Sequence, residues 1–171
     1  HAYKSAWLPQ RLLLLKEQGK LVDALFAASR FGTVNLHFNK GLAGAPSDVS
    51  AGALDTAINP SALDAFALAI ISSGGGSDFS SGHPLDKDAQ YASEGELRAA
   101  ASMSEVRRVA PDAGSYLSEG DYFQADVRSA FWGAHYERLK SVKAKYDPSD
   151  LFIVHHGIGS ENWSDDGFSA L

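Results

Sequence analysis

The sequence has 171 residues, of which 44% are hydrophobic and 21% are charged, the mix of a folded globular chain. Its net charge of -6 disfavours a nucleic-acid partner, and no apolar run reaches the roughly 20 residues that span a bilayer. Because the chain has no cysteine, it holds no disulfide, cysteine nucleophile or thiolate metal site. The first residue is His1, which fits either an ordinary trimmed terminus or a piece cut from a larger precursor.

Periodicity predicts a helical region and two strands in the first half of the sequence. Residues Pro9 to Ser29 have helical spacing, and Gly19 is expected to break them into two short helices. Thr33 to Asn39 alternates as a strand does. Asp64 to Ile71 also alternates, which fits a second strand or an alanine-rich helix. The Gly/Ser-rich stretch from Ser72 to Gly82 is expected to be a mobile loop.

The second half is predicted to be mainly helical. Ser93 to Val109 reads as a helix, in which Ser93 and Glu96 have the spacing of a capping box. A final long helix is expected from Ala125 to Lys145, stopped by the Asp-Pro pair that follows. The apolar run from Leu151 to Val154 is expected to be a strand or an extended segment packed on the body.

Two strands with at least three helices, and no strict βαβ rhythm, predict an α+β fold. A mostly antiparallel sheet with helices on one face fits this order best. Because two strands make too small a sheet to be stable alone, we expect the rest of the sheet to come from residues outside this sequence.

Three groups of polar residues are candidates for chemistry. Asn35, His37 and Asn39 share one strand face, which is either exposed to solvent or lines a pocket. In a pocket, their amide and imidazole groups would suit the hydroxyls of an alcohol or sugar. Glu119, beside a glycine, is either a solvated carboxylate or, if an apolar site raises its pKa, a general base. The adjacent histidines His155 and His156 point to opposite sides of an extended segment, so we predict no metal site.

Other site types lack their motifs. The stretch from Gly157 to Ser160 resembles a phosphate loop, but no third glycine or Lys-Ser/Thr pair follows it. No Gly-x-Ser-x-Gly elbow is present, so an unrelated hydrolase or lyase has no nucleophile motif to support it. The triplet that begins at Asn162 is a sequon, which accepts an N-glycan in a secreted protein or arises by chance.

Two blocks of the sequence carry a family resemblance. The first is Tyr116-Leu117-Ser118-Glu119-Gly120-Asp121, and the second begins Phe131-Trp132-Gly133 and continues through His135-Tyr136 to Tyr146-Asp147-Pro148 and Leu151-Phe152. Their order and spacing resemble the C-terminal segment of the berberine-bridge-enzyme-like flavoprotein oxidases, a branch of the vanillyl-alcohol oxidase superfamily. The ending from Val154 to Glu161 is similar to that of fungal secreted members, and so is the stretch from Leu36 to Gly41.

The resemblance implies a two-domain oxidase that is secreted and uses FAD. Residues 1–111 would be part of the substrate-binding domain, whose antiparallel sheet covers the flavin. Residues 112–171 would form the C-terminal segment, whose helix and tail return to the FAD-binding domain. The N-terminal FAD-binding part, which supplies most flavin contacts and the covalent attachment, would then be a partner outside this sequence, on the same chain or on a separate one.

The resemblance also implies roles for individual residues. Glu119 falls where members place a catalytic base, and Tyr116, Ser118 and His135 fall close to the flavin. Ser118 and His135 stand where members usually have asparagine, although both still form hydrogen bonds. Strand alternation, rather than the resemblance, leads us to expect that His37 and Asn39 orient a substrate hydroxyl.

The implied reaction moves hydride from an alcohol, sugar or phenolic secondary metabolite to flavin N5, and O2 then reoxidises the flavin to give hydrogen peroxide. The alternative is an interaction module that kept the fold and lost the activity. Fold alone does not choose among the substrates.

Overall fold

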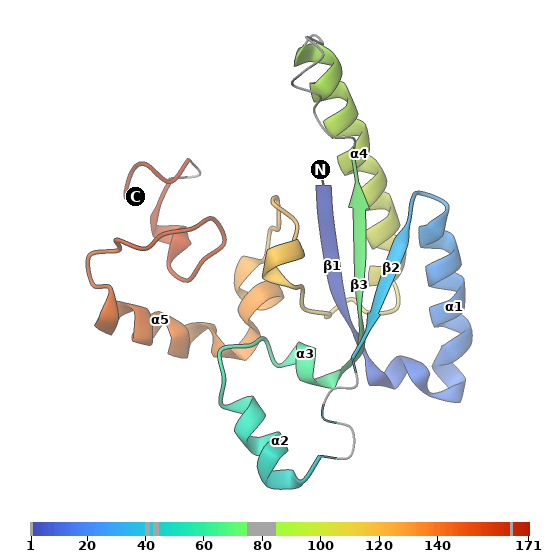
Figure 1. Ribbon diagram of the computed structural model, residues 1–171, viewed down its shortest axis with the longest axis horizontal. Helices are drawn as coiled ribbons and strands as arrows, with labels where there is room; N and C mark the ends of the chain where they lie inside the picture. The colour runs from blue at the N-terminus through green and yellow to red at the C-terminus, as the bar shows by residue number, and fades with distance from the viewer. Residues whose placement is uncertain (1, 40–41, 43–44, 75–84, 165) are drawn as a thin grey trace.

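The computed structural model describes residues 2–39, 42, 45–74, 85–164 and 166–171, with the side chains of 85–89 and 91 left aside. The predicted loop from Ser72 to Gly82 therefore lies largely outside the described residues. Within the described part, three strands form one antiparallel sheet in the order β1-β3-β2 (Figure 1). The strands are β1 (Ala2–Pro9), β2 (Val34–Phe38) and β3 (Ala65–Ser73).

Helices α1 (Leu15–Ser29) and α4 (Leu85–Arg107) cover one face of this sheet, and the strands lie in front of α4 in Figure 1. Ala67 and Ala69 on the central strand face these helices and are fully buried. Their small side chains let helix side chains pack closely against the sheet. The core between the two layers contains Ala6, Leu8, Leu12, Leu21, Ala28, Ile71, Ala99, Met103 and Val106.

The predicted α+β class and both predicted strands are confirmed, and the segment from 64 to 71 is a strand rather than a helix. Strand β1 was not predicted. Its pattern is obscured because Lys4 occupies a position on the buried, helix-facing side of the sheet. Glu96 of α4 and Asp121 both pair with Lys4, which makes a charge tolerable there.

Three helix boundaries differ from those predicted. A short 3-10 turn, η1 (Gln10–Leu13), precedes α1, and the break falls at extended Leu14 rather than at Gly19, which α1 passes through. Because a glycine inside a helix costs only about 1 kcal/mol, packing overrides it. Helix α4 begins at Leu85, so Ser93 and Glu96 lie inside it and form no cap.

The predicted final helix is interrupted. It comprises a π-helical turn η3 (Arg128–Trp132), a 3-10 turn η4 (Gly133–His135) and α5 (Tyr136–Tyr146). The interruption falls at Gly133, whose φ of 57° favours glycine. The predicted stop before the Asp-Pro pair is confirmed.

The run from Leu151 to Val154 was predicted to pack on the body, and this is wrong: it forms no strand, and Leu151 is 78% exposed. The tail and α5 extend away from the sheet in Figure 1. The remaining elements are α2 (Ser47–Leu54), α3 (Ser61–Asp64), η2 (Leu117–Glu119) and η5 (Ser160–Asn162). In the described ranges, no helix is long and apolar enough to cross a membrane.

Candidate functional site

The segment that leads into the candidate site runs along the outer edge of β1. The backbone N–H of Trp7 donates to the carbonyl of Gly114 at 2.9 Å. The Ser5 hydroxyl accepts from the backbone N–H of Tyr116 at 2.9 Å, and the Ser115 hydroxyl donates to the carbonyl of Ser5 at 2.8 Å. These three hydrogen bonds fix the position of Tyr116 beside β1.

A buried lysine fixes the other end of the same segment. The ammonium of Lys4 pairs with Glu96 at 2.6 Å and also with Asp121. Burial lowers the pKa of Lys4, but the hydrogen bonds to the two carboxylates outweigh it and leave the pKa raised. The Asp121 carboxylate also accepts from the backbone N–H of Phe123 at 3.0 Å. Lys4 thereby ties the loop after Glu119 to both β1 and α4.

Tyr116, Ser118 and Glu119 lie between these two anchors, on η2 and at its start. Tyr116 is 41% exposed and packs edge to face on Trp7, with ring centroids 6.2 Å apart. Ser118 is exposed and Glu119 is half-buried. Their three side-chain polar groups form no hydrogen bond with any other described residue. These groups are therefore available to a ligand, and their predicted roles remain predictions.

His135 is held by the segment that precedes α3. Its Nδ1 lies 3.0 Å from the carbonyl oxygen of Ile58, so the other ring nitrogen remains free within the described residues. The turn η4 that carries it starts at Gly133, where an added Cβ would lie 2.9 Å from Oδ1 of Asn59. The predicted cofactor contact at His135 therefore depends on the segment before α3.

Asn59 is a buried connector that sequence reasoning missed. Its side-chain NH₂ donates to the carbonyls of Ser129 and Ala130 at 3.1 and 2.9 Å. Its Oδ1 accepts from both the backbone N–H and the hydroxyl of Ser61, at 3.0 and 2.9 Å. The π-helical turn and α3 are thus joined through one side chain. An asparagine immediately before a proline and a short helix was the available signal.

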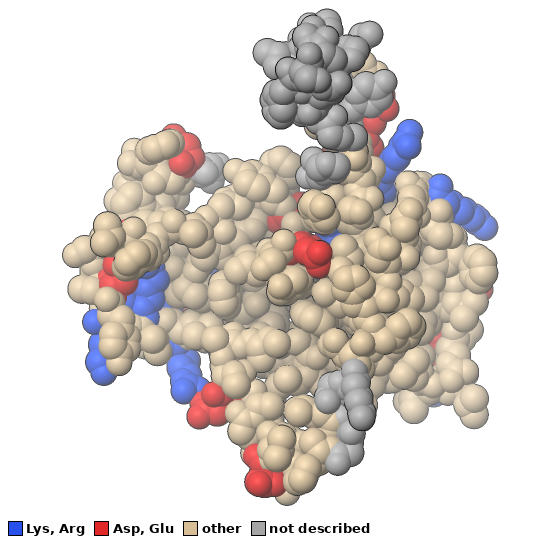
Figure 2. All heavy atoms as spheres, viewed as in Figure 1, with Lys and Arg blue, Asp and Glu red and all other residues tan. Residues whose placement is uncertain are grey.

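His37 is exposed on the sheet face opposite α1 and α4, on which Leu68 and Ile70 of β3 are buried. It pairs with Leu68, and Trp7 pairs with Leu68 from the other side, so the three side chains share that face. Since Trp7 contacts Tyr116, a continuous row runs from Tyr116 across the sheet to His37. In Figure 2 much of this view is uncharged, with an acidic patch near its centre and further charged side chains nearer the margins. Asn39 follows the strand, and its backbone N–H donates to the carbonyl of Phe66 at 2.7 Å.

The two adjacent histidines belong to one aromatic cluster. Their ring centroids lie 3.8 Å apart, so the prediction that they point to opposite sides is wrong. The ring of His155 stacks on Tyr122 at 4.1 Å, and His156 lies 5.3 Å from Phe131. The indole N–H of Trp132 donates to the carbonyl of His156 at 3.1 Å. Burial, followed by the charge of His155, lowers the pKa of His156. Over the described ranges, no three His, Cys, Asp or Glu side chains gather as metal ligands would.

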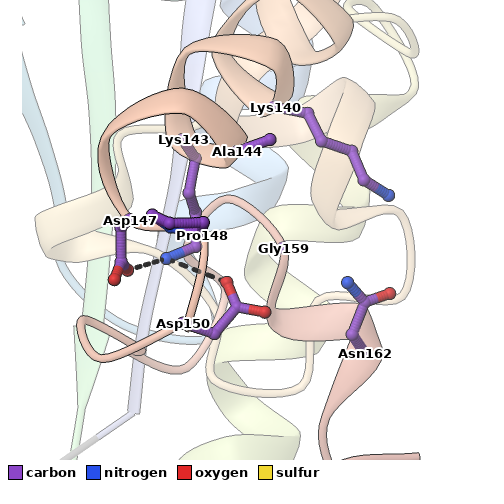
Figure 3. A pocket seen from close by; sticks show the side chains of 8 residues that line it. All are labelled: Lys140, Lys143, Ala144, Asp147, Pro148, Asp150, Gly159 and Asn162. Atoms are coloured by element: carbon purple, nitrogen blue, oxygen red, sulfur yellow. Dashed lines mark hydrogen bonds and ion pairs between the residues drawn. The ribbon is translucent and has the colours of Figure 1, made fainter.

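A separate pocket of about 170 Å³ lies beside α5 and has a structural role (Figure 3). The ammonium of Lys143 reaches Asp147 at 2.5 Å and Asp150 at 3.2 Å. The Asp147 carboxylate also accepts from the backbone N–H groups of Leu151 and Phe152. These contacts fold the chain back after α5. Asn162 lines this pocket, and the other predicted site residues do not.

Glu161 gives the tail a pH-dependent attachment. Its carboxylate accepts from Lys140 at 2.7 Å, Arg128 at 3.0 Å and the hydroxyl of Tyr136. Burial raises the pKa of Glu161, but the hydrogen bonds from Lys140 and Tyr136 outweigh it and lower the pKa from 4.5 to about 2.

Because this pKa is depressed, we expect the stabilisation by Glu161 to be complete above pH 4.5 and lost as the pH falls towards 2. Glu161→Gln should therefore destabilise the protein at pH 7 and make no difference near pH 2, measured by urea unfolding at each pH. Glu137→Gln, at an exposed carboxylate 3.8 Å from Arg128, is the control. A Glu161→Gln effect that stays constant across this range would contradict the assignment.

The C-terminal part of the chain is similar to a known family. The family model described as "Berberine and berberine like" matches residues 115–159. Residues 115–159 are a berberine-bridge-enzyme-like segment. The matched residues include Tyr116, Ser118, Glu119 and His135, whereas His37, Asn39 and Asn162 lie outside them.

Two curated proteins that are similar to this chain are named as flavin-dependent enzymes. The FAD-linked oxidoreductase notD' of Aspergillus versicolor is 45% identical over 69 residues, which are 40% of this chain and 11% of that protein. The flavin-dependent oxygenase ucdF of Aspergillus ustus is 53% identical over 57 residues, 33% of this chain and 10% of that protein. The chain thus spans about a tenth of the length of the curated relatives it matches.

The fold also matches a solved structure. The VAO-type flavoprotein MtVAO713 from Myceliophthora thermophila C1 superposes with a TM-score of 0.71 at 19% identity, over 95% of this chain and 27% of that one. This similarity covers the sheet and its helices as well as the C-terminal segment. The fold match therefore extends well beyond residues 115–159, which the family model matches.

Proposed function

We propose that this chain forms the substrate-side part of an FAD-linked oxidoreductase and acts as an oxidase. The observation that carries the proposal is the row from Tyr116 across Trp7 and Leu68 to His37. It joins residues of the family segment to the sheet face that carries His37. The names of the relatives, an FAD-linked oxidoreductase and a flavin-dependent oxygenase, support the same chemistry.

The residues present fit a flavin as a ligand. The hydroxyls of Tyr116 and Ser118 have no partner among the described residues, and His135 has one ring nitrogen free. These groups match the carbonyl oxygens and ring nitrogens at the edge of an isoalloxazine. FAD, when bound, supplies the redox chemistry by accepting hydride at N5 and passing electrons to O2, which gives hydrogen peroxide.

The chain's own contribution is proton transfer and orientation. Glu119 takes the proton from the O–H or N–H of the substrate onto its carboxylate, for which its half-buried, unpartnered side chain is suited. His37 and Asn39 orient a substrate hydroxyl by hydrogen bonds from the sheet face opposite α1 and α4. The substrate class is an alcohol, a sugar or a phenolic secondary metabolite.

The proposed partner is the N-terminal FAD-binding part of the same enzyme, either on the same chain or on a separate one. Residues 1–111 would then serve the substrate and residues 112–171 would pack on that part. Large apolar side chains exposed on the tail support this division, since burial would stabilise them. They are Leu151, Phe152, Val154, Phe168 and Leu171.

The test is made on the full-length protein. Purified material should show the visible absorbance of oxidised flavin, and an alcohol, sugar or phenol should bleach it under nitrogen. Air should restore the colour, with one hydrogen peroxide formed for each substrate oxidised. Flavin that no such substrate reduces would favour the alternative, an inactive interaction module. Protein that takes up no FAD would refute both.

We also propose that the protein is secreted and carries a glycan on Asn162. This residue is exposed at the end of η5, as an acceptor must be. Material secreted from a fungal host should lose mass on treatment with an N-glycosidase, and Asn162→Gln should lack the glycan attached at this site. Ser164→Thr keeps the sequon and is the control. Unmodified Asn162 in secreted protein would contradict the proposal.

A further inference from the structure

A second hollow lies apart from His37 and Glu119, neither of which lines it. Its volume is about 270 Å³. Three parts of the fold enclose it: the start of β1, the last turns of α4 and the loop after η2. The side chains that line it are mainly polar and include Lys4, Ser104, Arg107, Ser115, Asp121 and Gln124.

Arg107 is the unusual member of this hollow. It is partly buried, and burial lowers the pKa of its guanidinium. Unlike Lys4, it has no carboxylate within 4.0 Å among the side chains that the structure describes. A desolvated cation without a counter-charge is costly unless an anion compensates it.

Part of the Arg107 guanidinium is already used. It donates to the carbonyl of Ala113, to the carbonyl of Ser5 at 3.4 Å and to the hydroxyl of Ser115 at 3.0 Å. Since a guanidinium has five N–H groups, Nε–H and one N–H of Nη1 have no described partner. The guanidinium is therefore held in place by the fold and still has donors to offer.

Neighbouring donors are free as well. The hydroxyl of Ser104 and the side-chain amide of Gln124 form no hydrogen bond with any other described residue. The carboxylate of Asp121, which would repel an anion, shares the ammonium of Lys4 with Glu96. The lining therefore contains two cations, Lys4 and Arg107, against the single carboxylate of Asp121, together with free donors.

We propose that this hollow is a binding site for a small oxyanion, a phosphate or carboxylate group, with Arg107 as its charge partner. Arginine suits such groups because its N–H donors can bind two of their oxygens at once. Ser104 and Gln124 complete the contacts from α4 and from the loop. This site is separate from the proposed oxidation, since neither Glu119 nor any residue of the row between Tyr116 and His37 lines it.

The experiment is a calorimetric titration of the full-length protein with inorganic phosphate, against sodium chloride of equal ionic strength. We expect saturable binding with a Kd on the order of 1 mM, the affinity that a few charge-assisted hydrogen bonds support. Arg107→Gln should weaken it at least about tenfold. Arg108→Gln removes the same charge from an exposed neighbour and should change it by less than about twofold, because salt screens that charge.

A second pair of variants keeps every hydrogen bond of Arg107 in place. Ser104 is three residues before Arg107 on α4, so an aspartate there lies on the same helix face. Ser104→Asp should therefore occupy the guanidinium and abolish phosphate binding, while Ser104→Asn, which adds no charge, should weaken binding without abolishing it. The proposal is overturned if the unaltered protein shows no saturable binding. It is also overturned if Arg108→Gln weakens binding as much as Arg107→Gln, or if Ser104→Asp binds normally.

Discussion

Replacing Glu119 by glutamine should lower kcat/KM for substrate oxidation by about 10²–10⁴-fold, the usual contribution of a general base. Glutamine keeps the size and hydrogen-bonding capacity of the side chain but cannot take the proton. Because the carboxylate has no described partner, the substitution breaks no contact of the fold. The measurement is steady-state peroxide formation by the full-length protein, together with its flavin absorbance.

The pH profile separates a base from a merely structural carboxylate. The ascending limb of kcat/KM should disappear in Glu119→Gln, and the flavin content should remain that of the unaltered protein. Glu105→Gln, on the exposed side of α4 beside Arg108, changes the same functional group and should have no effect. An unchanged rate in Glu119→Gln would remove Glu119 from the mechanism.

The largest loss of stability is expected from Asn59→Ala. The change removes the donor of two carbonyls and the acceptor of two groups on Ser61, all around a buried side chain. Since leaving one buried polar group unsatisfied costs about 1–3 kcal/mol, we expect a loss of about 3 kcal/mol or more in the free energy of unfolding. Urea denaturation of the full-length protein measures it, with m compared between variants.

Asn35→Ala is the matched control, because Asn35 is an exposed asparagine on β2. It should change the stability by less than about 0.5 kcal/mol. Asn59→Ala should also loosen His135, since both depend on the segment before α3. Equal stability of the two variants would show that Asn59 does not connect α3 to the π-helical turn.

The sequence predicted the parts of the fold that rest on local pattern. Strands β2 and β3 alternate cleanly, and the segment that holds Tyr116 and Glu119 was found by its order of residues. Strand β1 was missed because Lys4 faces the core, where only Glu96 and Asp121, far along the chain, make it tolerable. The break at Gly133 was missed because it also depends on a distant residue, Asn59, which lies against Gly133.

The contacts of the candidate site that were missed are those made between distant parts of the chain. Asn59 bonds to residues about 70 positions later, and Arg107 reaches back to Ser5. The position of Asn59 before a proline marks a turn, but neither residue type nor spacing in a single sequence marks the distant partners of Asn59 and Arg107. Residue identity showed which groups could act at the site, whereas the structure shows what holds them.

The strand order has a consequence for how the chain folds. Strand β3 is the last of the described strands in sequence, yet it lies at the centre and bonds to both of the others. Neither β1 nor β2 has a described strand partner until β3 is made, and the pairing of Ala2 with Ser73 closes a long loop. Such non-local closure slows folding. Among the described strands, β1 therefore has no pairing partner until β3 has been synthesised.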